Sequence, residues 1–394
     1  LVAVAGSDAP AEVKRGAALA LVRHHRTAAL GAIRALLPGL DDLMQARAFW
    51  QQALSLSGLS ADLAKAFREQ ALDPKVAALN LPAVPDIDEH AELLGLLRQQ
   101  AGGAAMSGPT AESILSLAKL AAEKGDAVRG EAIYRQPGLA CTACHAIGGA
   151  GGKVGPDMTS IGASAPLDYL VESILMPGAK VKEGYHSVVI ETKDGRTLMG
   201  RLLRSGGGSV VLSDAAGQEI TLADSAILKR TDSGSLMPAN LIAGLKEQEQ
   251  LDLFKFLSQL GKPGEFDATK SRAPRVWAVM PLTGAMPETV TKGDPALPWI
   301  PINGTVNGTL LAGDVAPFAG TATEILAGAR LEIPEATEVT LKFPQPPLGV
   351  WVDGQPVTDG RVRLEAGIHK IVVRHKAGGD LRFESSAGTF LPSW

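Results

Sequence analysis

The chain has 394 residues, of which 45% are hydrophobic and 20% charged, and its formal net charge is −4. A chain of this length predicts about two to four domains, and its charge gives no support for a nucleic-acid partner or an anionic membrane surface. No run approaches the roughly 18 apolar residues of a membrane-spanning helix, so we predict no transmembrane segment. The first residues, LVAVAGSDAP, lack the basic region and cleavage site of a secretion signal. We expect a mature or truncated piece, with any export signal upstream.

Residues 1–122 carry apolar side chains at three- and four-residue spacing, the pattern of amphipathic helices. Asp8 and Asp41 are suitable N-caps for two of these helices. The first two segments resemble a HEAT-type helical hairpin, although no strict repeat period is present. The predicted helices cover 11–24, 27–37, 43–55, 61–71, 89–100 and 111–122.

Residues 123–262 combine two patterns. The segment DAVRGEAIYRQ and the segment 245–260 have helical periodicity. Between them, 185–231 alternates apolar and polar residues as strands do, with Gly-containing turn signals between the runs. We therefore predict a β-meander inserted into an otherwise helical domain, forming a small barrel-like unit.

Residues 263–394 lose the helical periodicity and show short alternating runs instead. This alternation predicts strands, and Asp353-Gly354 is a hairpin-turn signal between two of them. We predict an all-β sandwich over 263–394, similar to galactose-binding or PA14-like modules. The predicted strands cover 337–343, 348–353, 361–365, 369–375 and 380–384.

The two cysteines of the chain stand three positions apart, in the sequence Cys141-Thr-Ala-Cys144-His145. Two cysteines are too few for a disulfide framework or a four-thiolate zinc site. On one helical turn, two thiols at this spacing can each add to a vinyl group of the same haem, and the next histidine is placed to ligate its iron. We predict one covalently bound haem c, attached through Cys141 and Cys144 and ligated by His145. The alternative is a thioredoxin-like or unreactive cysteine pair.

The sequence around this motif resembles a known family. The stretches GDAVRGEAIY, CTACH, KVGPDMTSIG, EGYHSVVIETKDGRTLMGRL and SLMP, followed by the terminal helix, are similar to the haem-binding domain family of the Planctomycete–Verrucomicrobium type. The resemblance covers 123–262 and implies a class I cytochrome c fold whose first and last helices pack together. It also implies a helical region and often a sugar-dehydrogenase-like propeller before the domain. The residues expected at the helix contact are Gly130, Tyr134, Leu253, Phe256 and Leu257.

The resemblance implies two more site residues. The Pro156 carbonyl is expected to accept a hydrogen bond from His145 Nδ1, since a ligating histidine usually donates its other N–H group. Met237, in a Met-Pro pair ahead of the terminal helix, is the expected second axial ligand, so that His145 and Met237 would bind the iron. Most methionines are core residues, and the remaining candidates for the second ligand are Met158, Met176 (also followed by proline), Met199 and His186.

A haem iron with His and Met ligands has no vacant position for substrate or oxygen, and the thioether raises its reduction potential. The prediction is a periplasmic or otherwise extracytoplasmic electron-transfer protein, not an enzyme. It would relay electrons from a dehydrogenase, such as a sugar dehydrogenase, to a cytochrome or oxidase. The alternatives are a haem-based gas or redox sensor and a haem peroxidase, both with an open distal site.

Three tryptophans of the C-terminal region, Trp277, Trp299 and Trp351, are candidate sugar platforms for a glycan, although core packing is the favoured interpretation. The sequons at Asn303 and Asn307 are predicted to mark turns. The histidines predicted to be surface or structural residues are His24, His25, His90, His369 and His375.

Overall fold

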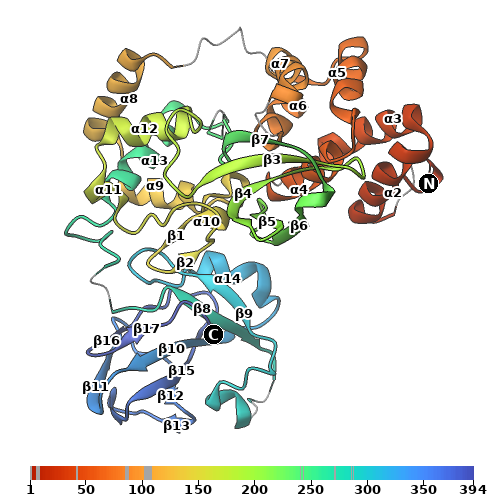
Figure 1. Cartoon of the computed structure of the whole chain (residues 1–394). Coiled ribbons are helices and arrows are strands. Elements are labelled where there is room, and N and C mark those ends of the chain that lie inside the picture. Colours follow the sequence, from red (N-terminus) through yellow and green to blue (C-terminus); the bar gives the residue numbers. More distant parts are fainter. Residues whose placement is uncertain are drawn as a thin grey trace. The chain divides into compact units, whose positions relative to one another are not determined.

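The computed structural model of the chain describes residues 2–5, 9–40, 43–84, 88–101, 109–239, 241–242, 244–269, 272–284, 286 and 288–394, so the predicted caps Asp8 and Asp41 lie outside it. The chain divides into two compact units, of which one contains 1–145, 152–156 and 165–258, and the other 146–151, 157–164 and 259–394. Helices and antiparallel sheets are both present, which confirms the predicted mixed α+β class (Figure 1). The domain boundaries at 122 and 262 stay predictions.

All the helices predicted before residue 123 are present, with small shifts at their ends. Two others, α1 and α6, are not among the predictions. Helix α6 begins where the Asp73 side chain accepts a hydrogen bond from Lys75 N–H at 2.9 Å, and Pro74 occupies its first turn, a position that proline favours. The helices are α1 (Val2–Ala5), α2 (Ala11–His24), α3 (Arg26–Leu36), α4 (Leu43–Leu54), α5 (Leu59–Glu69), α6 (Pro74–Asn80), α7 (Ala91–Gln100) and α8 (Ala111–Lys124).

These N-terminal helices share an apolar core around Trp50 and Phe67, both fully buried. The Trp50 indole N–H donates to Asn80 Oδ1 at 2.9 Å, and the Asn80 amide donates to Leu37 O at 3.2 Å. A buried donor without a partner costs about 1–3 kcal/mol. The α6 helix therefore supplies the one polar group that the tryptophan in this core needs.

Helices α9 (Ala127–Tyr134) and α13 (Glu247–Gln259) approach each other closely, which confirms the predicted contact. A Cβ atom added to Gly130 would lie 2.0 Å from Asp252 O and 2.6 Å from Phe256 Cβ, so only glycine fits. The Tyr134 and Phe256 ring centroids are 5.4 Å apart. Leu253 and Leu257 are buried on the same helix.

A buried carboxylate reinforces this crossing. Asp252 is 2% exposed, and its oxygens accept hydrogen bonds from Arg129 Nε at 2.7 Å and from Asp126 N–H at 2.8 Å. Burial raises the pKa of Asp252, but these hydrogen bonds outweigh burial and hold its pKa below the ordinary value. Asp252 therefore stays ionised and links the start of α9 to α13.

The predicted meander is a five-stranded antiparallel sheet in the order β6-β5-β4-β3-β7. Val188 and Ile190 on one face pack with apolar residues of β4, β5 and β6, whereas Ser187 and Val189 lie on the other face and are also buried. Strands β6 and β7 are the two edges, so these strands form an open sheet where a barrel-like unit was expected. The strands are β3 (His186–Thr192), β4 (Thr197–Gly206), β5 (Ser209–Ser213), β6 (Glu219–Ala223) and β7 (Ile227–Ser235).

The second unit contains two sheets that share one core, with strand orders β13-β12-β15-β10-β8-β9 (β17 also pairs with β10) and β14-β11-β16. Asp353 and Gly354 connect β12 to β13 with φ angles of 50° and 84°, which confirms the predicted hairpin turn. The helix α14 (Ala312–Ala319) departs from the all-β prediction. The main strands are β8 (Val276–Leu282), β9 (Ile300–Asn303), β10 (Glu324–Ile333), β11 (Thr337–Lys342), β12 (Gly349–Val352), β13 (Gln355–Pro356), β14 (Arg361–Leu364), β15 (Gly367–Lys376), β16 (Glu384–Ser385) and β17 (Thr389–Phe390).

Two helical glycines offer a matched test of the α9–α13 contact. Gly130→Ala forces a methyl group into the backbone of α13, and overpacking of this kind costs about 1–3 kcal/mol or more. Gly95→Ala, in α7, places its methyl group in open space and should stabilise the chain by up to about 1 kcal/mol through helix propensity. Urea unfolding of the two variants measures the difference, and equal effects would contradict the described crossing.

A buried histidine makes stability depend on pH. His90 is 2% exposed, and its Nδ1 lies 3.1 Å from Ser60 Oγ. Burial lowers the pKa of His90 from 6.5 to about 4. Above pH 6.5 the imidazole is neutral in the folded and unfolded chain, so stability is unaffected. Between pH 6.5 and 4 only the unfolded chain takes up the proton, and stability falls.

The free energy of unfolding should therefore drop by about 3 kcal/mol between pH 6.5 and 4 on account of His90. In His90→Gln this part of the pH dependence should disappear, while the exposed-site control His24→Gln should retain it. Urea unfolding at several pH values measures the slope. An unchanged slope in His90→Gln would mean that the pKa of this imidazole is the same in the folded and the unfolded chain.

Candidate functional site

The cysteine motif forms a single helical turn. Helix α10 (Cys141–Cys144) follows Ala140, which has a φ of 53°, and His145 leaves the turn in an extended conformation. The His145 N–H donates to Cys141 O at 2.8 Å, closing the turn. Both cysteines are half-buried, and they do not form a disulfide with each other. The two thiols and the imidazole are thus presented by five consecutive residues.

The predicted hydrogen bond between His145 and Pro156 is present, with Nδ1 and the carbonyl oxygen 2.7 Å apart. A carbonyl oxygen only accepts hydrogen bonds, so Nδ1 must carry the proton. The neutral ring then has its lone pair on Nε2, the tautomer that a metal-binding imidazole needs. The tautomer of His145 is therefore set by the backbone.

The loop that carries Pro156 is packed directly on the cysteine turn. Gly152 N–H donates to Thr142 O at 2.9 Å, and Gly155 N–H donates to Cys144 O at 2.8 Å. A Cβ atom on Gly155 would lie 2.4 Å from His145 Cε1, and one on Gly152 would lie 1.8 Å from Ala143 O. Gly152 is a site residue that the sequence patterns did not single out, whereas Gly155 belongs to the Gly-Pro pair that contains the predicted Pro156.

The candidates for a second axial ligand lie on different segments. Met237 is half-buried, follows the end of β7, and donates its N–H to Ser235 Oγ at 3.1 Å. Met176 caps the helix α12 (Leu167–Leu175), and Met199 lies within β4 opposite Val189. His186 is exposed, which disfavours it as a buried ligand. The assignment of Met237 stays a prediction.

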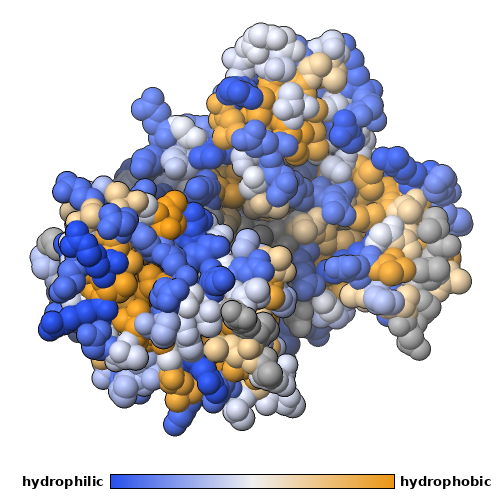
Figure 2. All heavy atoms as spheres, turned by 90° about the horizontal axis from the view of Figure 1, so that it is seen from below, coloured by the Kyte–Doolittle hydropathy of each residue, from blue (hydrophilic) through white to orange (hydrophobic). Residues whose placement is uncertain are grey.

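The described residues offer few sites of other types. In the part of the chain that the structure describes, no three His, Cys, Asp or Glu side chains come together as a metal-ion site. No helix in the described ranges is long and apolar enough to cross a membrane. Figure 2 shows separate hydrophobic areas set among hydrophilic residues on the visible face.

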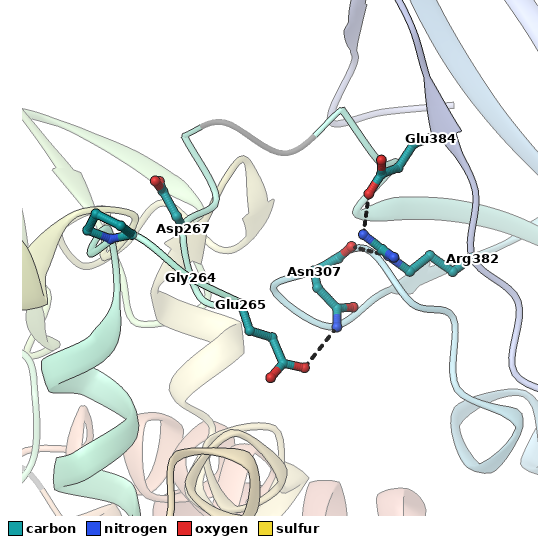
Figure 3. A pocket seen from close by; sticks show the side chains of 7 residues that line it. Gly264, Glu265, Asp267, Asn307, Arg382 and Glu384 are labelled. Carbon is teal, nitrogen blue, oxygen red and sulfur yellow. Dashed lines mark hydrogen bonds and ion pairs between the residues drawn. The ribbon is translucent and has the colours of Figure 1, made fainter. Parts of the chain in front are cut away.

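A polar cavity of about 490 Å³ lies in the second unit (Figure 3). Asn307 donates to Glu265 at 3.2 Å, and Arg382 pairs with Glu384 and donates to Asn307 O. Asp267 accepts a hydrogen bond from Thr269 N–H at 3.2 Å. The charged groups around this cavity already have partners within the chain, so it offers a weaker site than the cysteine turn.

The tryptophans of this unit are mostly packing residues. Trp277 is fully buried against Phe383, which excludes it as a sugar platform. Trp299 packs against Trp394, with ring centroids 4.9 Å apart, and Trp351 is half-buried on β12.

The sequon at Asn307 marks a turn, as predicted, whereas Asn303 is the last residue of β9. Asn307 Oδ1 accepts hydrogen bonds from Thr305 and Thr309, and Gly308 has a φ of 89°. The histidines outside the motif also fit their predictions, since His24 and His25 are exposed, His90 and His375 are buried, and His369 pairs with Asp353.

Comparison with known proteins adds no family assignment. No family model matches the chain, and no curated protein shows significant similarity to it. What the protein does must therefore be inferred from these residues and their geometry.

The tautomer of His145 can be tested without any cofactor. With seven histidines in the chain, histidine-selective ¹⁵N labelling and a two-bond ¹H–¹⁵N correlation spectrum should show His145 protonated at Nδ1, assigned by its loss in His145→Gln. Gly155→Ala should displace the ring and produce a mixture of tautomers, because the new methyl group collides with the imidazole. Gly138→Ala, with open space at its Cβ position, is the control. An Nε2-protonated ring in the unmodified chain would contradict the described geometry.

Proposed function

We propose that the chain is a monohaem c-type cytochrome that transfers electrons outside the cytoplasm. The observation that carries the proposal is the group formed by Cys141, Cys144, His145 and Pro156. Two thiols on one helical turn stand next to an imidazole whose Nδ1–H is held by a backbone carbonyl at 2.7 Å. Few other cofactors require this combination at this spacing.

Each of these residues has a defined task in the proposal. Cys141 and Cys144 would attach haem c covalently, and His145 would ligate its iron through Nε2. Pro156 O fixes the ring orientation and keeps the proton on Nδ1, which also increases the basicity of the ligating nitrogen. Gly155 leaves the space that the imidazole occupies. Bound haem supplies one-electron redox chemistry.

The surrounding fold supports a class I cytochrome arrangement. Helix α9 precedes the motif and crosses α13, the helix that follows Met237, at Gly130. Met237 is proposed as the second axial ligand, and filling both axial positions favours electron transfer over substrate turnover. An iron with both positions filled would make the protein an electron carrier and not an enzyme.

The wider context of the proposal is carried by the resemblance of 123–262 to the Planctomycete–Verrucomicrobium-type haem-binding domains. Covalent attachment of haem c would imply the periplasm or another extracytoplasmic compartment, where this type of haem is attached. The electron donor would be a dehydrogenase, with sugar dehydrogenases favoured, and the acceptor a cytochrome or oxidase. The helices before residue 123 would be HEAT-like, and the two sheets after residue 262 a galactose-binding-like module for a glycan.

The visible absorption spectrum of the purified chain tests this proposal. The unmodified protein should contain one covalent haem, low-spin in both oxidation states, with the weak red charge-transfer band of methionine–ferric ligation. Met237→Ala should remove this band and give a high-spin ferric iron, because one axial position is then vacant. Met176→Ala, also in a Met-Pro pair, is the matched control and should retain the band.

Three other outcomes would redirect the assignment. Loss of the band in Met176→Ala instead would make Met176 the ligand. A high-spin spectrum and carbon monoxide binding in the unmodified protein would favour a sensor or peroxidase. Absence of covalent haem after expression with a haem-attachment system would overturn the proposal.

A further inference from the structure

One end of the β3–β7 sheet contains two buried polar atoms without partners. Arg201 Nε on β4 and Ser233 Oγ on β7 have essentially no exposed surface and no hydrogen-bond partner among the described residues. Arg201 pairs with Ser187 on β3, which pairs with Gly234 on β7. Ser233 is the extra residue of the β-bulge beside Gly234. The two atoms therefore belong to neighbouring positions across three strands.

The chemistry of these atoms restricts what could satisfy them. Arginine Nε–H is a donor with no acceptor capacity, and a serine hydroxyl can donate. The neighbouring hydroxyl of Ser187 already donates to Gly234 O at 3.1 Å, and the guanidinium of Arg201 stacks 4.8 Å from the Tyr185 ring centroid. A ligand with acceptor oxygens, and a negative charge to match the guanidinium, would satisfy both.

The position of this pair relative to Met237 suggests which anion it binds. Strand β7 ends at Ser235, and the Ser235 hydroxyl accepts the Met237 N–H at 3.1 Å. Neighbouring strands lie about 4.8 Å apart, so Arg201 is only two strand spacings from the residues that lead into Met237. Arg201 also lies on the sheet face opposite the apolar cluster of Val188 and Ile190. A group ligated by Met237 would therefore lie near this end of the sheet.

We infer that Arg201 and Ser233 bind a propionate carboxylate of the haem. This inference rests on the proposed function, and on Met237 as the second ligand. The guanidinium would donate through Nε to the carboxylate and offset its negative charge, while the Tyr185 ring fixes the orientation of the guanidinium. The added positive charge close to the iron would disfavour the ferric state and raise the reduction potential. The β insert would thus bind a haem propionate and raise the reduction potential, in addition to preceding the proposed ligand Met237.

The test compares reduction potentials and resonance Raman spectra of the haem-loaded chain and four variants. Arg201→Gln should shift the potential to more negative values and shift the propionate bending band, with the methionine–ferric band retained. Arg201→Lys should recover part of the potential, and Ser233→Ala should give a smaller negative shift. Arg204→Gln, on the same strand and exposed, is the control and should match the unmodified protein.

The results separate this inference from the proposed function. Covalent haem with unaltered potential and propionate band in Arg201→Gln and Ser233→Ala would overturn the propionate site and leave the cytochrome assignment intact. Should Arg201→Gln fail to fold, Arg201→Lys and Ser233→Ala decide the question in the same way. Lack of covalent haem in the unmodified chain would overturn the proposed function itself.

Discussion

The hydrogen bond between His145 Nδ1 and Pro156 O is the interaction on which the candidate site depends. It joins the residue that ends the cysteine turn to a loop ten residues further on, and the loop is held to the same turn by the N–H groups of Gly152 and Gly155. A side chain at Gly152 or Gly155 would collide with the turn or the imidazole. The position of the ring is thus set by its contacts with backbone atoms of the loop.

A second constraint, the close approach of α9 and α13, holds the ends of this region together. Gly130 allows the two helix backbones to touch. Asp252 adds specific hydrogen bonds to this contact, because it accepts from Arg129 and from the N–H of Asp126 just before α9. A buried carboxylate adds little net stability when it replaces well-packed apolar groups. Its value here is that it permits one register between the helices, since a shift by one turn would leave an ionised group buried without donors.

Sequence patterns predicted much of the fold because most elements repeat a clear period. The helices α2 to α5, α7 and α8, and the strands β3 to β7, follow from apolar spacing alone. The sequence did not reveal α6, since its seven residues are too few for a period to register, and the capping signal at Asp73-Pro74 was the only indication. Strand β10 was missed because it is buried on both faces, so its residues are nearly all apolar and do not alternate.

The sequence also predicted the part of the candidate site that local geometry determines. Cys141, Cys144, His145 and Pro156 are close in sequence, and local geometry brings them together. The Gly-Gly and Gly-Pro pairs after the motif are visible in the sequence, but the roles of Gly152 and Gly155 depend on how closely the loop approaches the helical turn, which the sequence alone does not give. Arg201 and Ser233 are harder to predict, because only the register of three strands separated by loops of different length puts them at neighbouring positions.

The two faces of the inserted sheet β3–β7 differ in composition, since one is apolar and the other carries polar side chains. Its Val188 face forms an apolar cluster with β4, β5 and β6 that is complete within the sheet. The opposite face carries Ser187 and Val189, which are buried, and Arg201, which is half-buried with its Nε atom covered. Because side chains alternate along a strand, a slip of one residue would exchange the two faces. The apolar cluster therefore fixes the register that places Arg201 and Ser233, and stability of the sheet and placement of its polar residues are two consequences of the same pairing.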